Sequence, residues 1–65
     1  LSRREKEIFQ SMAQGLTTNE IASSLFISIK TIQTHQSNIK KKLQMKSLSE
    51  LRNFAQNHSI PTSYN

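Results

Sequence analysis

The sequence has no cysteine and no tryptophan, and it holds only one glycine and one proline among its 65 residues. The absence of cysteine excludes a disulfide framework and a thiolate metal site. The two histidines, His35 and His58, are isolated, so we expect neither a metal nor any other cofactor. A chain this short buries only about 60% of the surface that it exposes when unfolded. We therefore expect a small core that rests on helix–helix packing.

Long apolar runs and paired catalytic groups are also missing. No apolar stretch is long enough to span a bilayer and no signal-peptide pattern is present, so we expect no membrane partner. No carboxylate pair and no nucleophile–base pair is identifiable, and a domain of this size has little room for a pocket. These absences argue against an enzyme.

Acidic residues are scarce and unevenly placed. Four acids stand against nine lysines and arginines, which gives a net charge of +5. No acid lies between residues 21 and 49, and this window carries the whole excess on Lys30, Lys40, Lys41, Lys42 and Lys46. A lysine run taken alone is usually a solvated face, but charge concentrated in this way favours an anionic partner.

A helix-start signal occurs three times in the chain. The pattern Ser/Thr-x-x-Glu begins at Ser2, Thr17 and Ser47, and each copy opens a segment with helical apolar spacing. Such a pattern predicts a capping box, in which the hydroxyl and the glutamate satisfy backbone N–H groups at the helix start. Gly15 suits the left-handed position that ends a helix, and Pro61 blocks helix continuation.

The predicted fold is therefore all-α. We expect helices at about residues 3–14, 18–25, 29–43 and 48–57, which form a compact four-helix domain over residues 1–60, followed by a frayed tail at 61–65. The missing initiator methionine and the polar end suggest a domain excised from a longer protein. Only about three residues join the two middle helices, which is typical of a central helix-turn-helix.

Residues 28–43 are the most informative stretch. Ser28 is a candidate N-cap, and Ile32, Ile39 and Leu43 fall on one stripe of a helix. The other positions are mostly polar or cationic, and none is acidic. Such a helix can anchor in a small core while its outer face lies in a DNA major groove, about 12 Å wide. We interpret it as a recognition helix.

The pattern of residues over about positions 1–57 resembles the LuxR/FixJ/NarL-type DNA-binding domain of bacterial transcription regulators. The resemblance is carried by Leu1, Ser2, Arg4, Glu5, Glu7, Ile8, Gly15, Leu16, Thr17, Asn19, Glu20, Ile21, Ala22, Leu25, Ile27, Ser28, Thr31, Ile32, His35, Asn38, Ile39, Lys42 and Leu43. Gln33 departs from the Lys or Arg frequent in the family, and Ile29 departs from an acidic or polar residue. The first departure bears on which DNA sequence is read.

The resemblance implies sequence-specific binding of double-stranded DNA, with the third helix in the major groove. Such a domain is the output part of a cytoplasmic, nucleoid-bound regulator, often a two-component response regulator with a receiver or ligand-sensing domain. It implies base contacts from Gln33, Thr34 and Ser37, whose alternative is an ordinary solvated helix face. Glutamine can pair with adenine, and a threonine methyl can contact thymine.

Phosphate contacts are expected from the ends of both middle helices and from His35 in the middle of the second of them. The residues are Thr17, Thr18, Asn19, Lys30, His35, Lys40 and Lys41. The start of a helix offers free N–H groups and a favourable dipole to a phosphate. The alternative for Thr17 is simple capping. For His35, a packed and hydrogen-bonded imidazole is favoured over any catalytic or metal role.

The fourth helix offers candidates for contact between two copies of the chain, as the resemblance implies. They are Leu48, Leu51, Arg52, Phe54 and Ala55, and the alternative places all the apolar ones in the core. Two half-sites would multiply the affinity of a small module for DNA.

Two rival functions remain open from the sequence. One is a promoter reader like region 4 of a sigma factor, and RNA polymerase is a candidate partner. The other is a basic helical protein-interaction module, against which the polar Gln/Thr/Ser-rich surface of the basic window argues.

Overall fold

The computed structural model describes residues 1–57, which form four helices and no strand in that range. The helices are α1 (Arg3–Ala13), α2 (Thr18–Leu25), α3 (Ile29–Lys42) and α4 (Leu48–Asn57). This confirms the all-α four-helix prediction, and the predicted bounds differ by at most one residue at any helix end. The domain end at residue 60, the tail at 61–65 and His58 lie outside the described residues.

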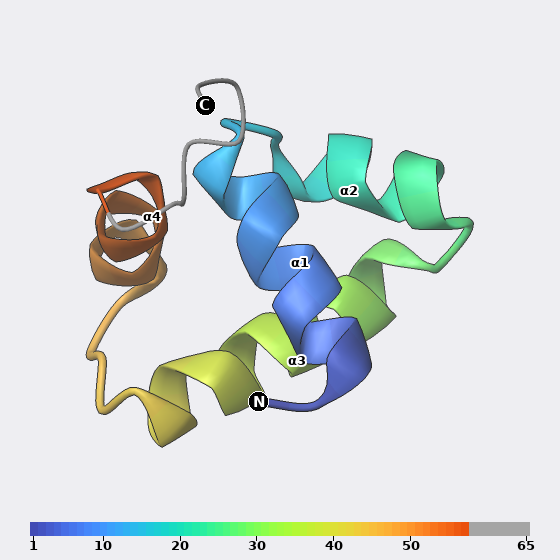
Figure 1. Cartoon of the computed structure of the whole chain (residues 1–65). Helices are drawn as coiled ribbons and strands as arrows, with labels where there is room; N and C mark the ends of the chain where they lie inside the picture. Colours follow the sequence, from blue (N-terminus) through green and yellow to red (C-terminus); the bar gives the residue numbers. More distant parts are fainter. Residues whose placement is uncertain (58–65) are drawn as a thin grey trace.

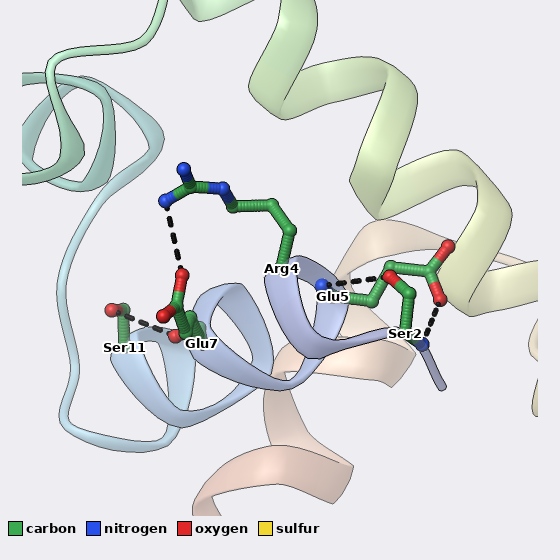
Figure 2. A network of polar contacts seen from close by, with 5 residues as sticks. All are labelled: Ser2, Arg4, Glu5, Glu7 and Ser11. Atoms are coloured by element: carbon green, nitrogen blue, oxygen red, sulfur yellow. Dashed lines mark hydrogen bonds and ion pairs between the residues drawn. The ribbon is translucent and has the colours of Figure 1, made fainter.

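The helix starts are fixed by side-chain caps. Ser2 and Thr17 form complete capping boxes with the glutamates three residues on, as predicted; Figure 2 shows the Ser2 box at the start of α1. The third box differs from the prediction. Ser47 Oγ accepts from the Glu50 N–H at 3.1 Å, but the Glu50 carboxylate accepts from the N–H of Lys46 at 2.9 Å. The reciprocal bond therefore reaches one residue further back, and the connector after α3 is tied to α4.

Three helix ends share one closing geometry. A left-handed residue follows each helix within two positions, with φ of 91° at Gly15, 57° at Phe26 and 59° at Gln44. In each case the next N–H donates back to a carbonyl five residues earlier, which is the bond that defines a Schellman motif. These bonds run from Leu16 to Ser11 (3.1 Å), from Ile27 to Ala22 (3.0 Å) and from Met45 to Lys40 (2.8 Å). The sequence predicted this geometry only at the glycine.

The core lies around α1, which packs against all three other helices. In Figure 1, α2 and α4 lie on opposite sides of α1, and α3 passes across it. The apolar core side chains are Ile8, Met12, Ile21, Ala22, Ile32, Ile39, Leu51 and Ala55. Phe9 of α1 and Phe54 of α4 extend this core with a tilted ring pair, 6.0 Å between centroids. The two helices of the helix-turn-helix, α2 and α3, therefore both pack against α1, and α4 packs against α1 and α3.

One charged group is buried where the start of α1 meets the end of α3. Glu5 of α1 is only 4% exposed, and its Oε1 accepts from Lys42 Nζ of α3 at 2.7 Å and from the Ser2 N–H at 2.9 Å. These bonds, the lysine's above all, lower the pKa of Glu5 from 4.5 to about 2. A buried carboxylate is tolerated when it is paired and hydrogen-bonded in this way. The pair fixes the end of α3 against the start of α1.

On the surface of α1, Arg4 Nη1 contacts Glu7 Oε1 at 3.0 Å, as Figure 2 also shows. Both side chains are about half exposed, so this pair contributes little to stability. None of the helices within residues 1–57 is both long and apolar enough to cross a bilayer.

Candidate nucleic-acid interface

The helix α3 has two opposite stripes with the same spacing. Its inner stripe steps by four, three and four residues through Ile32, Gln36, Ile39 and Leu43, of which the first three are buried and Leu43 is half-buried. Its outer stripe steps in the same way through Lys30, Thr34, Ser37 and Lys41, and all four are exposed. An offset of two residues corresponds to more than half a helical turn, since a turn holds about 3.6 residues. The core contact of the inner stripe therefore directs the outer stripe into solvent.

The three predicted base-contact residues are all exposed. Thr34 and Ser37 lie on the outer stripe, and Gln33 lies on its flank. Thr34 Oγ1 donates to the Lys30 carbonyl oxygen at 3.2 Å. Because its hydroxyl hydrogen is used within the helix, Thr34 offers outward a methyl group and acceptor lone pairs.

The lysine run at the end of α3 separates into three different environments. Lys40 is half-buried, Lys41 is exposed, and Lys42 is paired with Glu5. Within residues 1–57, Lys30 and Lys41 have no acidic partner. The outer stripe thus has an unpaired cation at each end and two uncharged hydroxyl residues between them.

The start of α2 lies beside this helix in the helix-turn-helix. Thr17 Oγ1 accepts from the Glu20 N–H at 3.2 Å, so Thr17 does cap the helix. The N–H groups of Thr18 and Asn19 have no hydrogen-bond partner among the described residues. Thr18 is half-buried and Asn19 is exposed. Two backbone donors therefore remain open at the positive end of the α2 dipole.

His35 is half-buried, and its Nδ1 is the one buried side-chain nitrogen or oxygen without a partner in the described part of the chain. The packed position agrees with the favoured alternative for this residue, but the hydrogen bond expected with it is missing at Nδ1. A buried ring nitrogen without a partner costs free energy, whether it is a donor or an acceptor.

Gln36 is a functional candidate that the sequence reasoning missed. It is 3% exposed, and its Nε2 lies 3.3 Å from Thr18 Oγ1 and 3.8 Å from Met12 Sδ. Its position four residues after Ile32 and three before Ile39 was the signal for burial. One side chain thus links the recognition helix to both α1 and α2.

The structure corrects two of the five candidates for contact between chains. Leu51 and Ala55 have no exposed surface, so they are core residues and cannot touch a second copy. Leu48, Arg52 and Phe54 are half-buried. The outer face of α4 is polar, and its exposed residues are Ser49, Glu50, Asn53, Gln56 and Asn57.

Comparison with known proteins gives consistent matches. The family described as "Bacterial regulatory proteins, luxR family" matches residues 1–55. The spore germination protein GerE of Bacillus subtilis is 50% identical over 50 residues, which cover 77% of this chain and 68% of GerE. The oxygen regulatory protein NreC of Staphylococcus carnosus is 46% identical over 55 residues, or 85% of this chain and 25% of NreC. The uncharacterized transcriptional regulatory protein YhcZ of Bacillus subtilis is 40% identical over 60 residues, or 92% of this chain and 28% of YhcZ. The chain therefore spans about a quarter of NreC and of YhcZ.

Proposed function

The chain belongs to the LuxR family of bacterial regulatory proteins and is a helix-turn-helix DNA-binding domain of that family, and from this premise we propose how it binds. The helix α3 enters the major groove of duplex DNA, as the output element of a longer transcription regulator. The observation that carries the proposal is the outer stripe of α3, which is exposed, free of acids, and ends in unpaired lysines.

The dimensions of α3 suit this role. Its 14 residues extend for about 21 Å at 1.5 Å per residue. An α-helix together with its side chains fits into the major groove, which is about 12 Å wide. The lysines at either end of the stripe then lie near the two phosphate backbones that flank the groove. Thr34 and Ser37 lie between them, where base edges are exposed.

Base reading is assigned to Gln33, Thr34 and Ser37. The Gln33 carboxamide can donate and accept at once, which matches the N6 and N7 groups of adenine. The outward methyl of Thr34 suits the methyl group of thymine, and the Ser37 hydroxyl can donate or accept. We therefore expect a site whose centre contains A·T pairs.

Phosphate binding is assigned to two groups of donors. Lys30, Lys40 and Lys41 supply charge from α3. The start of α2 supplies the open N–H groups of Thr18 and Asn19, with the neighbouring cap residue Thr17. We also assign a phosphate contact to His35, which is half-buried on α3. Such contacts set the register and hold the helix in the groove without reading sequence.

The experiment that tests this proposal is a fluorescence-anisotropy titration of a mixed-sequence duplex. Lys30→Ala combined with Lys41→Ala removes the two ends of the outer stripe, and we expect affinity to fall at least tenfold at low salt. Arg3→Ala combined with Lys6→Ala is the charge-matched control, because both residues are exposed cations on α1 and lie outside the helix-turn-helix. An equal loss in the control, or no binding by the unaltered chain, would refute the proposal.

Assembly on DNA is proposed to involve two copies that meet through α4. The residues available are Leu48, Arg52 and Phe54, which keep part of their surface in solvent. The chain's span of about a quarter of NreC and of YhcZ supports a sensing or receiver segment elsewhere in the whole regulator. Such a regulator would act in the cytoplasm, where the bacterial chromosome lies.

A further inference from the structure

A carboxamide lies buried beneath the recognition helix, at the point where α1, α2 and α3 meet. Gln36 is 3% exposed and touches Thr18 of α2 and Met12 of α1 through its Nε2. Its neighbours on the inner stripe, Ile32 and Ile39, are apolar and have no exposed surface. A polar side chain at such a site needs hydrogen-bond partners, since burial without them costs about 1–3 kcal/mol.

The partners of Gln36 determine which way round its amide lies. The Met12 sulfur is 3.8 Å from one terminal atom of the amide, and a thioether can accept a hydrogen bond but cannot donate one. The amide NH₂ group, and not its oxygen, therefore faces inward. The same NH₂ group is 3.3 Å from Thr18 Oγ1, so Gln36 is the donor and the threonine oxygen is the acceptor.

This direction decides what Thr18 can do. A hydroxyl has one hydrogen to donate and two lone pairs to accept. Because Gln36 fills one lone pair from the buried side, the hydroxyl hydrogen is left to point outward from the half-buried residue. The open N–H groups of Thr18 and Asn19 lie on the same first turn of α2.

We propose that Gln36 is a positioning residue, which holds the Thr18 hydroxyl as a third donor to one DNA phosphate at the start of α2. This inference rests on the proposed function. It means that a single side chain of the groove-reading helix also sets the phosphate contact of the neighbouring helix. A hydrogen bond inside the protein then fixes how the base-contacting helix α3 is oriented relative to the phosphate-binding start of α2.

A double-mutant cycle in DNA binding tests the proposal. Thr18→Val removes the hydroxyl at nearly constant shape, and Gln36→Met removes the donor while it fills an apolar site. We expect each variant to bind a duplex recovered by selection from random sequences about tenfold more weakly, since a hydrogen bond to a charged acceptor is lost. The double variant should also be about tenfold weaker, not about a hundredfold, because Gln36 acts only through Thr18.

Three further measurements separate positioning from structural damage. Thr18→Ser keeps the hydroxyl and should keep wild-type affinity. The slope of log K against log salt should be the same in all the variants, because no cation is removed. Thermal unfolding followed by circular dichroism should show each variant folded at the binding temperature. If Gln36→Met does not fold, Gln36→Leu takes its place in the cycle.

Two results of these measurements would overturn the positioning role of Gln36. Additive losses in the double variant would show that Gln36 acts independently of Thr18 and would overturn the inference. Full affinity of Thr18→Val would also overturn it. In both cases a weakened Lys41→Ala variant shows that DNA binding by α3 stands, whereas absence of binding by the unaltered chain would remove the proposed function itself.

Discussion

Glu5 is the residue at which charge and folding are most closely coupled. Its carboxylate is almost completely buried and accepts from Lys42 and from the Ser2 N–H. The pKa of this carboxyl group is therefore about 2 in the folded chain, against an ordinary value of 4.5. Between these two values the unfolded chain binds a proton that the folded chain does not. The contribution of Glu5 to stability is thus complete above pH 4.5 and is lost as the pH falls to 2.

We expect the free energy of unfolding to decrease between pH 4.5 and pH 2, and Glu5→Gln to flatten this decrease. The variant should also be less stable than the unaltered chain at pH 7, because a buried amide replaces the carboxylate beside Lys42. Urea titrations at several pH values measure both effects. The same pH dependence in both proteins would show that the Glu5–Lys42 pair does not control acid stability.

Phe26 is a residue whose backbone is strained and whose side chain has no packing role. It is 94% exposed, and its φ of 57° lies in the left-handed region. That region costs about 1–2 kcal/mol for a residue with a Cβ, and glycine avoids this cost.

We therefore expect Phe26→Gly to stabilise the fold by about 0.5–1 kcal/mol, after allowance for the greater freedom of glycine in the unfolded chain. The midpoint of urea unfolding measures this gain in stability. Phe26→Ala is the matched control, since alanine keeps the strain and removes only the exposed ring. A gain of the same size in the alanine variant would indicate that exposed apolar surface, not φ, is responsible.

At the scale of the helix, the sequence predicted most of what is local. The caps at Ser2, Thr17, Ser28 and Ser47 and the spacing of apolar residues predicted all four helices, because capping and amphipathic periodicity act over a few residues. The left-handed ends at Phe26 and Gln44 were missed because neither residue favours that conformation by itself. There the bond from the next N–H and the packing of the following residue override the local preference.

The side-chain environments on α3 were less predictable, because they depend on partners far away in the chain. Three consecutive lysines stand at positions 40–42, yet only Lys42 pairs with Glu5, which lies 37 residues earlier. Gln36 depends in the same way on Thr18, 18 residues earlier. A sequence pattern gives the face of the helix on which a residue lies, but pairing between helices requires their packing.

The two kinds of contact assigned to α3 predict different binding defects. Gln33→Ala removes the amide that we propose reads a base, so we expect a loss of about 1–3 kcal/mol at the preferred sequence and a relaxed preference at one base pair. Lys41→Ala removes a proposed phosphate contact, so its loss should be nearly equal on all duplexes. Anisotropy titrations against a panel of single-base variants of a selected site compare the two. If Gln33→Ala weakens every duplex equally, Gln33 is not a base-reading residue.

For the whole molecule, the pairing of charges sets how strongly DNA binding depends on salt. Five phosphate-bound lysines from the acid-free window would give a slope of log K against log salt of about −4.5. However, Glu5 holds Lys42, and Lys46 lies beyond the end of α3. Lys30, Lys40 and Lys41 remain, so one bound chain should give a slope of about −3. The donors of α2 are neutral and should add affinity without adding to the slope.

This difference provides a test of assembly through α4. Two chains on a duplex with two half-sites should give a slope of about −6, and one chain on a single half-site about −3. Arg52→Glu changes a half-buried residue of α4 outside the helix-turn-helix, so it should abolish cooperative binding of the second chain while single half-site affinity changes little.

Titrations of both duplexes at several salt concentrations, with stoichiometry from analytical ultracentrifugation, measure the slopes and the cooperativity. Unchanged cooperativity in Arg52→Glu would exclude Arg52 from the contact, and a slope near −3 on the double site at saturation would show that the two chains do not bind together.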